Sequence, residues 1–200
     1  MRPDGFPVQV LRTIDPERTR ATIVQAATQV LYERGLDGIG VAELCTRLGV
    51  SKETLYRHFG TKDGLVHAVL ETRSDRVIEW LTDAVTSSGD VPADQLTALF
   101  QALQSWYDGP DFRGCALINA ATQHHTDAVR AITARHGDRY LALLTGIAER
   151  AGVPDPRRLA GQLLILAEGA TVVADHHGAA RAGDLAGQAA LALLAAAGRS

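Results

Sequence analysis

Apolar residues recur at spacings of three and four through most of the chain, a period typical of helices with one buried face. Strict apolar–polar alternation, the pattern of a half-buried strand, occurs nowhere, and no internal repeat is visible. We therefore predict an all-α protein of about nine helices.

Local start and stop signals give the expected boundaries. Asp15-Pro16 and Asp155-Pro156 each combine an N-cap residue with proline in the first turn, and Gly35 follows a periodic segment as a C-terminal stop. In the first helix we expect an inward face of Ile23, Ala26, Ala27, Val30 and Leu31. The predicted helices cover residues 15–34, 41–48, 51–59, 62–85, 92–107, 115–123, 127–151, 156–176 and 180–197.

The segment VAELCTRLGVSKETLYRHFGTK, residues 41–62, predicts two short helices joined by a tight turn at Gly49. Ser51 can cap the second helix, and Leu55 and Phe59 lie on its inward face with the spacing i, i+4. Cys45 is expected to pack in the same core. The outward face is rich in hydrogen-bond donors, namely Lys52, Thr54, Tyr56, Arg57 and His58. This arrangement is typical of a helix-turn-helix that binds the DNA major groove.

Composition and charge agree with that interpretation. With 46% hydrophobic and 22% charged residues and a net charge of −3, the chain has the composition of an ordinary soluble protein that does not coat nucleic acid non-specifically. Positive charge is concentrated locally, because residues 47–62 contain four basic residues and only one acidic residue.

Cysteine usage and the termini indicate the compartment. Cys45 and Cys115 are far apart, without metal-binding or redox spacing, so we expect free buried thiols in a reducing, cytoplasmic environment. No signal peptide or membrane span is apparent, and no membrane partner is expected. Residues 1–14 are predicted to be a flexible arm, in which Arg2 or Arg12 could add a minor-groove or phosphate contact.

The run LGVSKETLYRHF, residues 48–59, with Thr61-Lys62 after it, resembles the TetR family of bacterial transcriptional regulators. The resemblance covers about residues 15–75, and RGCALINAATQ at residues 113–123 is similar to the C-terminal domain of one branch. It implies a helix-turn-helix DNA-binding domain at residues 15–61 and a helical ligand-binding and dimerisation domain at residues 62–200. Residues 62–85 would connect the two domains.

The resemblance also implies roles for particular residues. Lys52, Glu53, Thr54 and His58 match positions that face bases or adjacent phosphates, whereas Tyr56 and Lys62 match phosphate contacts. Glu53 could instead only complement its helix N-terminus. The predicted DNA-binding set is Val41, Ser51, Lys52, Glu53, Thr54, Tyr56, Arg57, His58 and Lys62.

Two positions depart from the family pattern. Gly40 and Val41 stand where a serine or threonine hydroxyl usually contacts phosphate, so that only backbone N–H groups could replace the contact. Gly64 should weaken the first turn of its helix by up to about 1 kcal/mol relative to alanine.

A ligand pocket is predicted from the aromatic residues around the break at residues 108–114. Its candidate lining is Trp106, Tyr107, Phe112, Cys115, Asn119 and Glu168, with Asn119 and Glu168 as orienting polar groups. Ordinary core packing explains the aromatic residues equally well. For Glu168, which lies in an apolar run, pairing across a subunit interface is the alternative.

The histidine pairs His124-His125 and His176-His177 do not predict a metal site. Adjacent residues of a helix point about 100° apart, so neither pair can chelate an ion by itself. We expect neither a metal nor a cofactor.

The last two helices carry more apolar surface than one bundle needs, which favours a homodimer interface built as a four-helix bundle. Part of this set could instead belong to the core of one subunit. The candidates are Leu159, Leu163, Leu164, Leu166, Val172, Leu185, Leu191 and Leu194.

Together these features predict a transcriptional regulator that binds double-stranded DNA. The resemblance favours a homodimeric repressor released from a palindromic operator by an apolar or aromatic small-molecule inducer. The alternatives are a ligand-independent regulator, a protein-binding helix-turn-helix module, or an all-α enzyme using the histidines or Glu168. No nucleophile–base–orienter spacing supports an enzyme.

Overall fold

The computed structural model describes residues 16–178 and 181–198, and these ranges contain nine α-helices and no strand. The all-α prediction is confirmed. The predicted N-terminal arm lies outside the described residues. The helices are α1 (Pro16–Arg34), α2 (Val41–Leu48), α3 (Lys52–Phe59), α4 (Lys62–Ser87), α5 (Pro92–Tyr107), α6 (Ala116–Gln123), α7 (Asp127–Arg150), α8 (Pro156–His177) and α9 (Ala182–Ala197).

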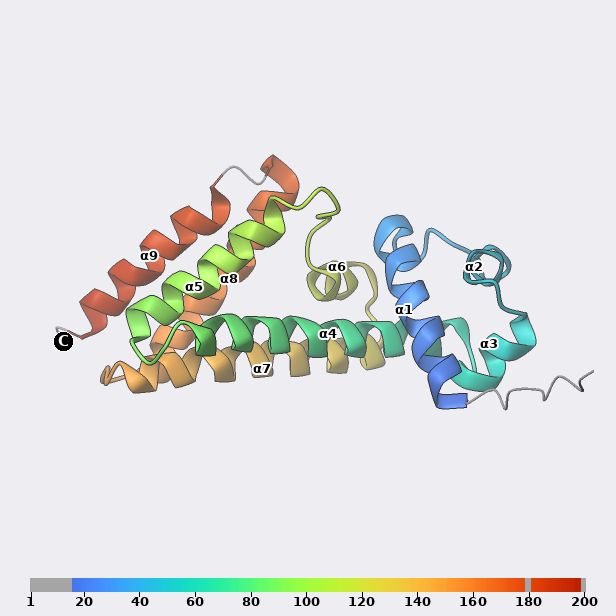
Figure 1. Cartoon of the computed structure of the whole chain (residues 1–200), viewed down its shortest axis with the longest axis horizontal. Coiled ribbons are helices and arrows are strands. Elements are labelled where there is room, and N and C mark those ends of the chain that lie inside the picture. Colours follow the sequence, from blue (N-terminus) through green and yellow to red (C-terminus); the bar gives the residue numbers. More distant parts are fainter. Residues whose placement is uncertain (1–15, 179–180, 199–200) are drawn as a thin grey trace, which may run out of the picture.

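The described part of the chain is elongated, with α1, α2 and α3 at one end (Figure 1). Helices α4 and α7 run side by side along its length, and α5, α8 and α9 form a bundle at the opposite end. The short helix α6 lies between the two ends. Two hydrophobic cores correspond to this division.

The first core joins α1, α2 and α3 to the first parts of α4 and α7 and to the short helix α6. Leu44, Leu55 and Leu65 are completely buried in it. The expected inward face of α1 requires one correction, because Ala26 is exposed and Val24 is buried. The inward stripe is therefore rotated slightly, and Thr28 joins it by donating its hydroxyl to the carbonyl of Val24 at 2.8 Å.

The second core fills the bundle of α5, α7, α8 and α9 with the last part of α4. Helix α4 contributes Leu65 and Val69 to the first core and Leu81 and Val85 to the second. Helix α7 likewise contributes Val129 and Ile132 to the first core and Leu144 and Ile147 to the second, so α4 and α7 both extend from one core into the other.

Helices α8 and α9 do carry exposed apolar residues, and of the expected set Val172 and Leu185 are among them. Leu159 and Leu163 are buried in the core of the same chain. The side chains that solvent reaches are Ile165 (72% exposed), Leu185 (58%), Val173 (48%) and Val172 (37%). In the uninterrupted apolar run of α8, sequence alone does not distinguish these two faces. In the described part of the chain, no helix is long and apolar enough to span a membrane.

Candidate functional site

The turn between α2 and α3 is closed by backbone hydrogen bonds. Gly49 adopts φ 65° and ψ 30°, the left-handed conformation that glycine adopts without steric cost. The Gly49 N–H donates to the Thr46 carbonyl at 3.2 Å and the Val50 N–H to the Cys45 carbonyl at 3.1 Å. This pair of bonds is a Schellman motif, which ends α2 and sets the direction of α3.

Helix α3 is positioned by its cap and by its inward face. The Ser51 hydroxyl accepts from the Thr54 N–H at 3.0 Å, as its predicted capping role requires. Leu55 is fully buried, Cys45 is buried, and Phe59 is half-buried against the same core. The predicted core role of these three residues is confirmed, and the opposite face of α3 is left to solvent.

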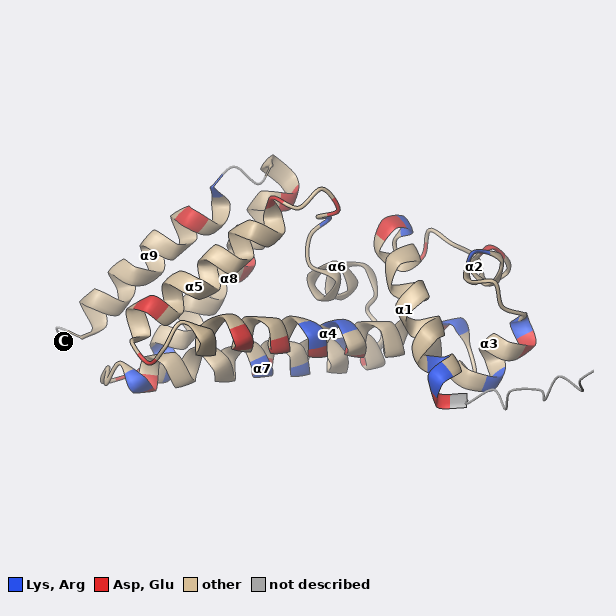
Figure 2. Cartoon of the chain, in the orientation of Figure 1, with Lys and Arg blue, Asp and Glu red and all other residues tan. Residues whose placement is uncertain are grey.

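The outward face of α3 presents Lys52, Tyr56 and Arg57 to solvent, with Tyr56 44% exposed. Among the described residues, neither Lys52 nor Arg57 forms an ion pair. By contrast, Arg47 on α2 is held by Glu43 at 2.9 Å. Basic residues lie at both ends of α3 (Figure 2). The exposed donors that a DNA contact requires are thus available on α3 rather than on α2.

The remaining predicted DNA-binding residues occupy more varied environments. Ser51 and Glu53 are exposed, whereas Thr54 and His58 are half-buried. The Thr54 hydroxyl forms a hydrogen bond with the Ser51 hydroxyl at 3.0 Å. A contact from Thr54 to a base would therefore have to use the remaining donor or acceptor capacity of this hydroxyl.

Lys62 and Val41 lie at the starts of two helices that flank α3. The Lys62 ammonium donates to the Leu36 carbonyl at 2.7 Å, which leaves two of its three N–H groups for a phosphate. Val41 packs on the core, and the cap Gly40 makes no side-chain hydrogen bond. The first bond of this helix runs from the Leu44 N–H to the Gly40 carbonyl, so the backbone N–H groups of residues 41–43 can still bind an anion.

Gly64 has a packing role that helix propensity did not predict. A Cβ at this position would lie 2.0 Å from the Phe59 carbonyl oxygen. Glycine therefore allows the end of α3 to approach the first turn of α4, while the Thr61 hydroxyl caps that turn at the Gly64 N–H. The structure thus accounts for this departure from the family pattern.

Sequence reasoning missed Arg20 on α1. Its guanidinium carbon lies 5.3 Å from the centre of the Phe59 ring, so α1 places a positive charge beside the end of α3. Its distance in sequence from residues 41–62 concealed this proximity.

The predicted aromatic cluster forms. The ring of Phe112 lies 4.9 Å from that of Trp106 and 5.2 Å from that of Tyr107. Trp80 of α4, which had not been assigned to the cluster, also meets Trp106 edge-on at 6.2 Å. Tyr107 is buried and shares a hydrogen bond with the Thr171 hydroxyl at 2.8 Å, and burial raises its pKa to about 12.

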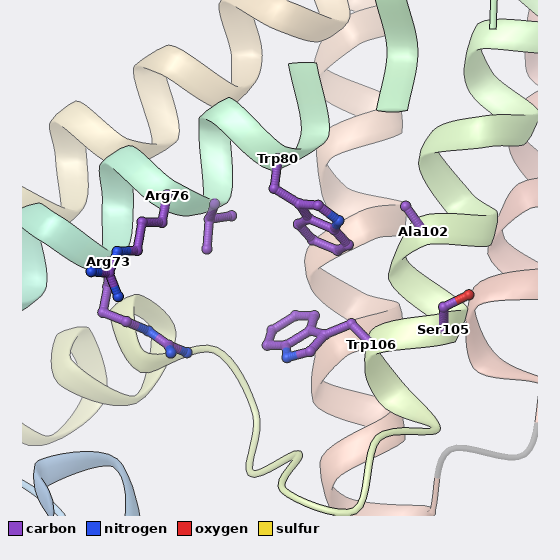
Figure 3. Close-up of a pocket in the computed structure, with 7 residues that line it drawn as sticks. Arg73, Arg76, Trp80, Ala102, Ser105 and Trp106 are labelled. Atoms are coloured by element: carbon purple, nitrogen blue, oxygen red, sulfur yellow. The ribbon is translucent and has the colours of Figure 1, made fainter. Parts of the chain in front are cut away.

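A cavity of about 570 Å³ opens between α4 and α5 (Figure 3). Two arginines lie toward one end and the two indoles toward the other. The volume is that of a small-molecule site. Its lining is Arg73, Arg76, Val77, Trp80, Ala102, Ser105 and Trp106.

Of the six residues predicted to bind ligand, only Trp106 lines this cavity. Asn119 lines a much smaller one of about 60 Å³ and donates its amide to the Arg113 carbonyl at 3.0 Å. Cys115 is buried at the start of α6, and burial raises the pKa of its thiol. Glu168 lines a separate cavity of about 390 Å³ between α6, α7 and α8, where burial raises its pKa. The expected polar groups are therefore not brought together with Trp106.

Helix α4 is attached to α7 by a buried polar contact that sequence reasoning did not anticipate. Ser74 Oγ lies 3.0 Å from His136 Nδ1 and accepts from Arg139 at 3.3 Å. Burial, together with the charge of Arg139, lowers the pKa of His136 to about 4. The imidazole is therefore neutral at physiological pH.

The histidine pairs do not converge on one point. His124 lies 3.3 Å from the Asp37 carboxylate, whereas His176 is exposed beside Asp175. Within residues 16–178 and 181–198, no group of three His, Cys, Asp or Glu side chains could hold a metal ion. Cys45 and Cys115 are both free and buried, as predicted.

Comparison with known proteins places these observations in a family. The sequence profile of bacterial regulatory proteins of the tetR family matches residues 23–69. A solved structure of a tetR-type transcriptional regulator from Streptomyces avermitilis superposes with a TM-score of 0.77 and 30% identity, over 90% of this chain and 97% of that one.

Two relatives match over shorter lengths. The transcriptional activator FasR of Mycolicibacterium smegmatis is 30% identical over 92 residues, and the transcriptional repressor Rv3405c of Mycobacterium tuberculosis is 44% identical over 55 residues. These matches cover 46% and 28% of this chain, and 40% and 29% of the relatives' own lengths.

Proposed function

Because the chain belongs to the TetR family of bacterial regulatory proteins, we propose that it is a DNA-binding regulator of transcription and not an enzyme. In this proposal the protein is a homodimeric repressor that leaves a palindromic operator when a small molecule binds its C-terminal bundle. The observation that carries the DNA-binding part is the exposed face of α3, where Lys52 and Arg57 form no ion pair within the described residues.

The α3 helix of each subunit would enter the major groove. Lys52, Glu53, Thr54 and His58 would face bases or nearby phosphates, while Tyr56, Lys62 and the N–H groups at the start of α2 would hold the backbone. Two such helices would contact half-sites about 34–36 Å apart.

The exposed apolar face of α8 and α9, around Ile165 and Leu185, supports the dimer part of the proposal. Ile165, Val172 and Val173 have the spacing i, i+7, i+8 and therefore lie on one face of α8, and a contiguous exposed apolar face is typical of an interface. The cavity between α4 and α5 supports ligand control over the ligand-independent alternative, because α4 takes part in both cores.

Fluorescence anisotropy with the DNA that flanks the gene tests the DNA-binding surface. At one fixed salt concentration, Arg57→Ala should weaken binding by about 1–3 kcal/mol, because an arginine contact to a base or phosphate is lost. Arg157→Ala, which removes an exposed arginine at the start of α8, is the matched control and should bind as the wild type does.

Unchanged affinity in both Arg57→Ala and Lys52→Ala would refute the assigned face. Salt dependence separates the protein-binding alternative, because neutralisation of phosphates makes DNA affinity fall steeply with salt. Affinity that does not vary with salt would favour a protein-binding module.

A further inference from the structure

The cavity between α4 and α5 has an unusual charge for an apolar site. On α4, residues 73, 76, 77 and 80 have the spacing i, i+3, i+4, i+7 and form one stripe that faces α5. Such a stripe is normally apolar, but its first two residues are Arg73 and Arg76. Two positive charges therefore line one part of a cavity whose other part is formed by Trp80 and Trp106 (Figure 3).

These arginines lack an acidic partner in the described part of the chain. On α4, Glu71 and Asp75 are already paired with α7, at 2.9 Å to Arg135 and 2.6 Å to Arg139. Glu79, three residues after Arg76, forms no ion pair with either arginine within residues 16–178 and 181–198. In addition, the Nε–H of Arg73 is shielded from solvent and donates to no protein acceptor. A buried donor of this kind is costly until an acceptor reaches it.

We propose that this cavity binds an anionic small molecule, a carboxylate with an apolar or aromatic body, and that its anion draws Arg73 away from Tyr32. The carboxylate would accept hydrogen bonds from Arg73 and Arg76, and the body would pack against Trp80 and Trp106. This inference rests on the proposed function and specifies the chemical class of the effector.

Arg73 also contacts the DNA-binding end of the molecule. Its guanidinium carbon lies 4.7 Å from the centre of the Tyr32 ring, and Arg73 lines both the large cavity and the small one beside Tyr32. Tyr32 belongs to α1. Its hydroxyl donates to the Gly114 carbonyl at 2.9 Å and accepts from the Arg113 N–H at 2.8 Å.

Tyr32 therefore connects α1 to the segment between α5 and α6, and Arg73 covers its ring. A charged hydrogen bond is worth about 10- to 150-fold in an equilibrium constant, against about 2- to 30-fold for a cation–π contact. A carboxylate in the cavity should therefore bind the Arg73 guanidinium more strongly than the Tyr32 ring does. Loss of the guanidinium then weakens one of the contacts that join α1 to the segment between α5 and α6.

Intrinsic fluorescence gives a direct binding assay, because the chain has only two tryptophans and both line the cavity. The probes are phenylbutanoate and its neutral amide, phenylbutanamide, titrated into the full-length protein without DNA. We expect the carboxylate to quench emission with an affinity at least about 10-fold above that of the amide.

Charge-neutral variants of similar length test the assignment of the arginines. The preference for the carboxylate should fall several-fold in Arg73→Met and in Arg76→Met, and should disappear in the double variant. Arg157→Met is the matched control and should keep the preference. Equal affinity for the two probes, no quenching by either at millimolar concentration, or a preference that survives the double variant would overturn the inference.

The link to DNA is tested with saturating phenylbutanoate in the anisotropy assay. The wild type should bind DNA more weakly, and by linkage DNA should weaken probe binding by the same factor. Tyr32→Phe keeps the ring but removes the hydroxyl, so it should bind the probe normally and lose much of that coupling. If Tyr32 had only a structural role, Tyr32→Phe would change the DNA affinity measured without probe, but the factor by which the probe weakens DNA binding would stay the same.

Full coupling in Tyr32→Phe, or no effect of saturating probe on wild-type DNA affinity, would refute the link through Tyr32. The two proposals fail separately. Probe binding is measured without DNA, and DNA binding without probe tests the proposed function alone.

Discussion

Acidification should destabilise this protein through His136. The imidazole is 6% exposed and neutral, and it contacts the Ser74 hydroxyl between α4 and α7. Because Arg139 donates to Ser74 Oγ, the Ser74 hydroxyl can donate to a neutral Nδ1. A proton on that nitrogen would prevent it from accepting the hydrogen bond of the Ser74 hydroxyl and would place a second positive charge beside Arg139. Glu168 and Arg130 line the same cavity as His136, and the Asp75 carboxylate holds the guanidinium of Arg139 at 2.6 Å.

The size of the effect follows from the pKa of His136, which is about 4 in the folded protein against an ordinary value of 6.5. The unfolded chain therefore takes up the proton first as the pH falls. The stabilisation is fully present above pH 6.5 and is lost as the pH falls to 4. A pKa difference of about 2.5 corresponds to about 3 kcal/mol in total, of which about 2 kcal/mol is lost by about pH 5.

Urea unfolding of the wild type and of His136→Gln, at about pH 7.5 and about pH 5, measures this effect. Both proteins contain the same carboxylates and six other histidines, so the comparison isolates His136. Between the two pH values the wild type should lose about 2 kcal/mol more stability than His136→Gln. Protein concentration must be fixed, because association contributes to apparent stability.

The matched control is His125→Gln, at an exposed position, which should follow the wild type. If the wild type and His136→Gln lose equal stability on acidification, the reasoning from burial and from Arg139 is refuted.

Three further predictions concern the fold and its assembly. Leu55→Ala should cost about 2–5 kcal/mol in urea unfolding, because it leaves a cavity behind α3; a loss well under 1 kcal/mol would contradict this. Gly64→Ala should destabilise the protein by about 1–3 kcal/mol, because the added Cβ clashes with the Phe59 carbonyl. The control is Gly137→Ala, where a Cβ meets nothing within 4 Å and which should stabilise by up to about 1 kcal/mol. A stabilising effect of Gly64→Ala would contradict the close approach of the two helices. Ile165→Asp should yield monomers in sedimentation velocity, and an intact dimer would move the interface elsewhere.

The order and type of the helices follow from local signals in the sequence. Gly49 and Ser51 set helix ends through hydrogen bonds within a few residues, so the positions of these ends could be predicted closely. The inward position of Leu55 and the outward position of Arg57 also follow from the helical period alone. Because these features depend only on residues close together in the chain, the candidate DNA-binding surface could be predicted from the sequence.

The effector cavity could not be predicted in the same way. Arg73 and Arg76 have the sequence context of solvated arginines, and only the placement of α5 against α4 puts them opposite Trp106. The contact between Arg73 and Tyr32 depends on how α1 packs on α4. Glu168, an attractive candidate in its apolar run, instead faces a different cavity with His136.

The same division applies within single helices. In the apolar run of α8, Leu163 is fully buried and Ile165 is 72% exposed, although both have the hydrophobicity of core residues. Gly64, a weak helix former, is explained by a carbonyl that approaches from the preceding helix. The helices, their caps and the donor-rich face of α3 follow from the amino-acid sequence alone, because those features depend on neighbours along the chain. Tertiary packing decided which apolar face stays exposed and which charged groups line the cavity, because those depend on residues brought together from distant helices.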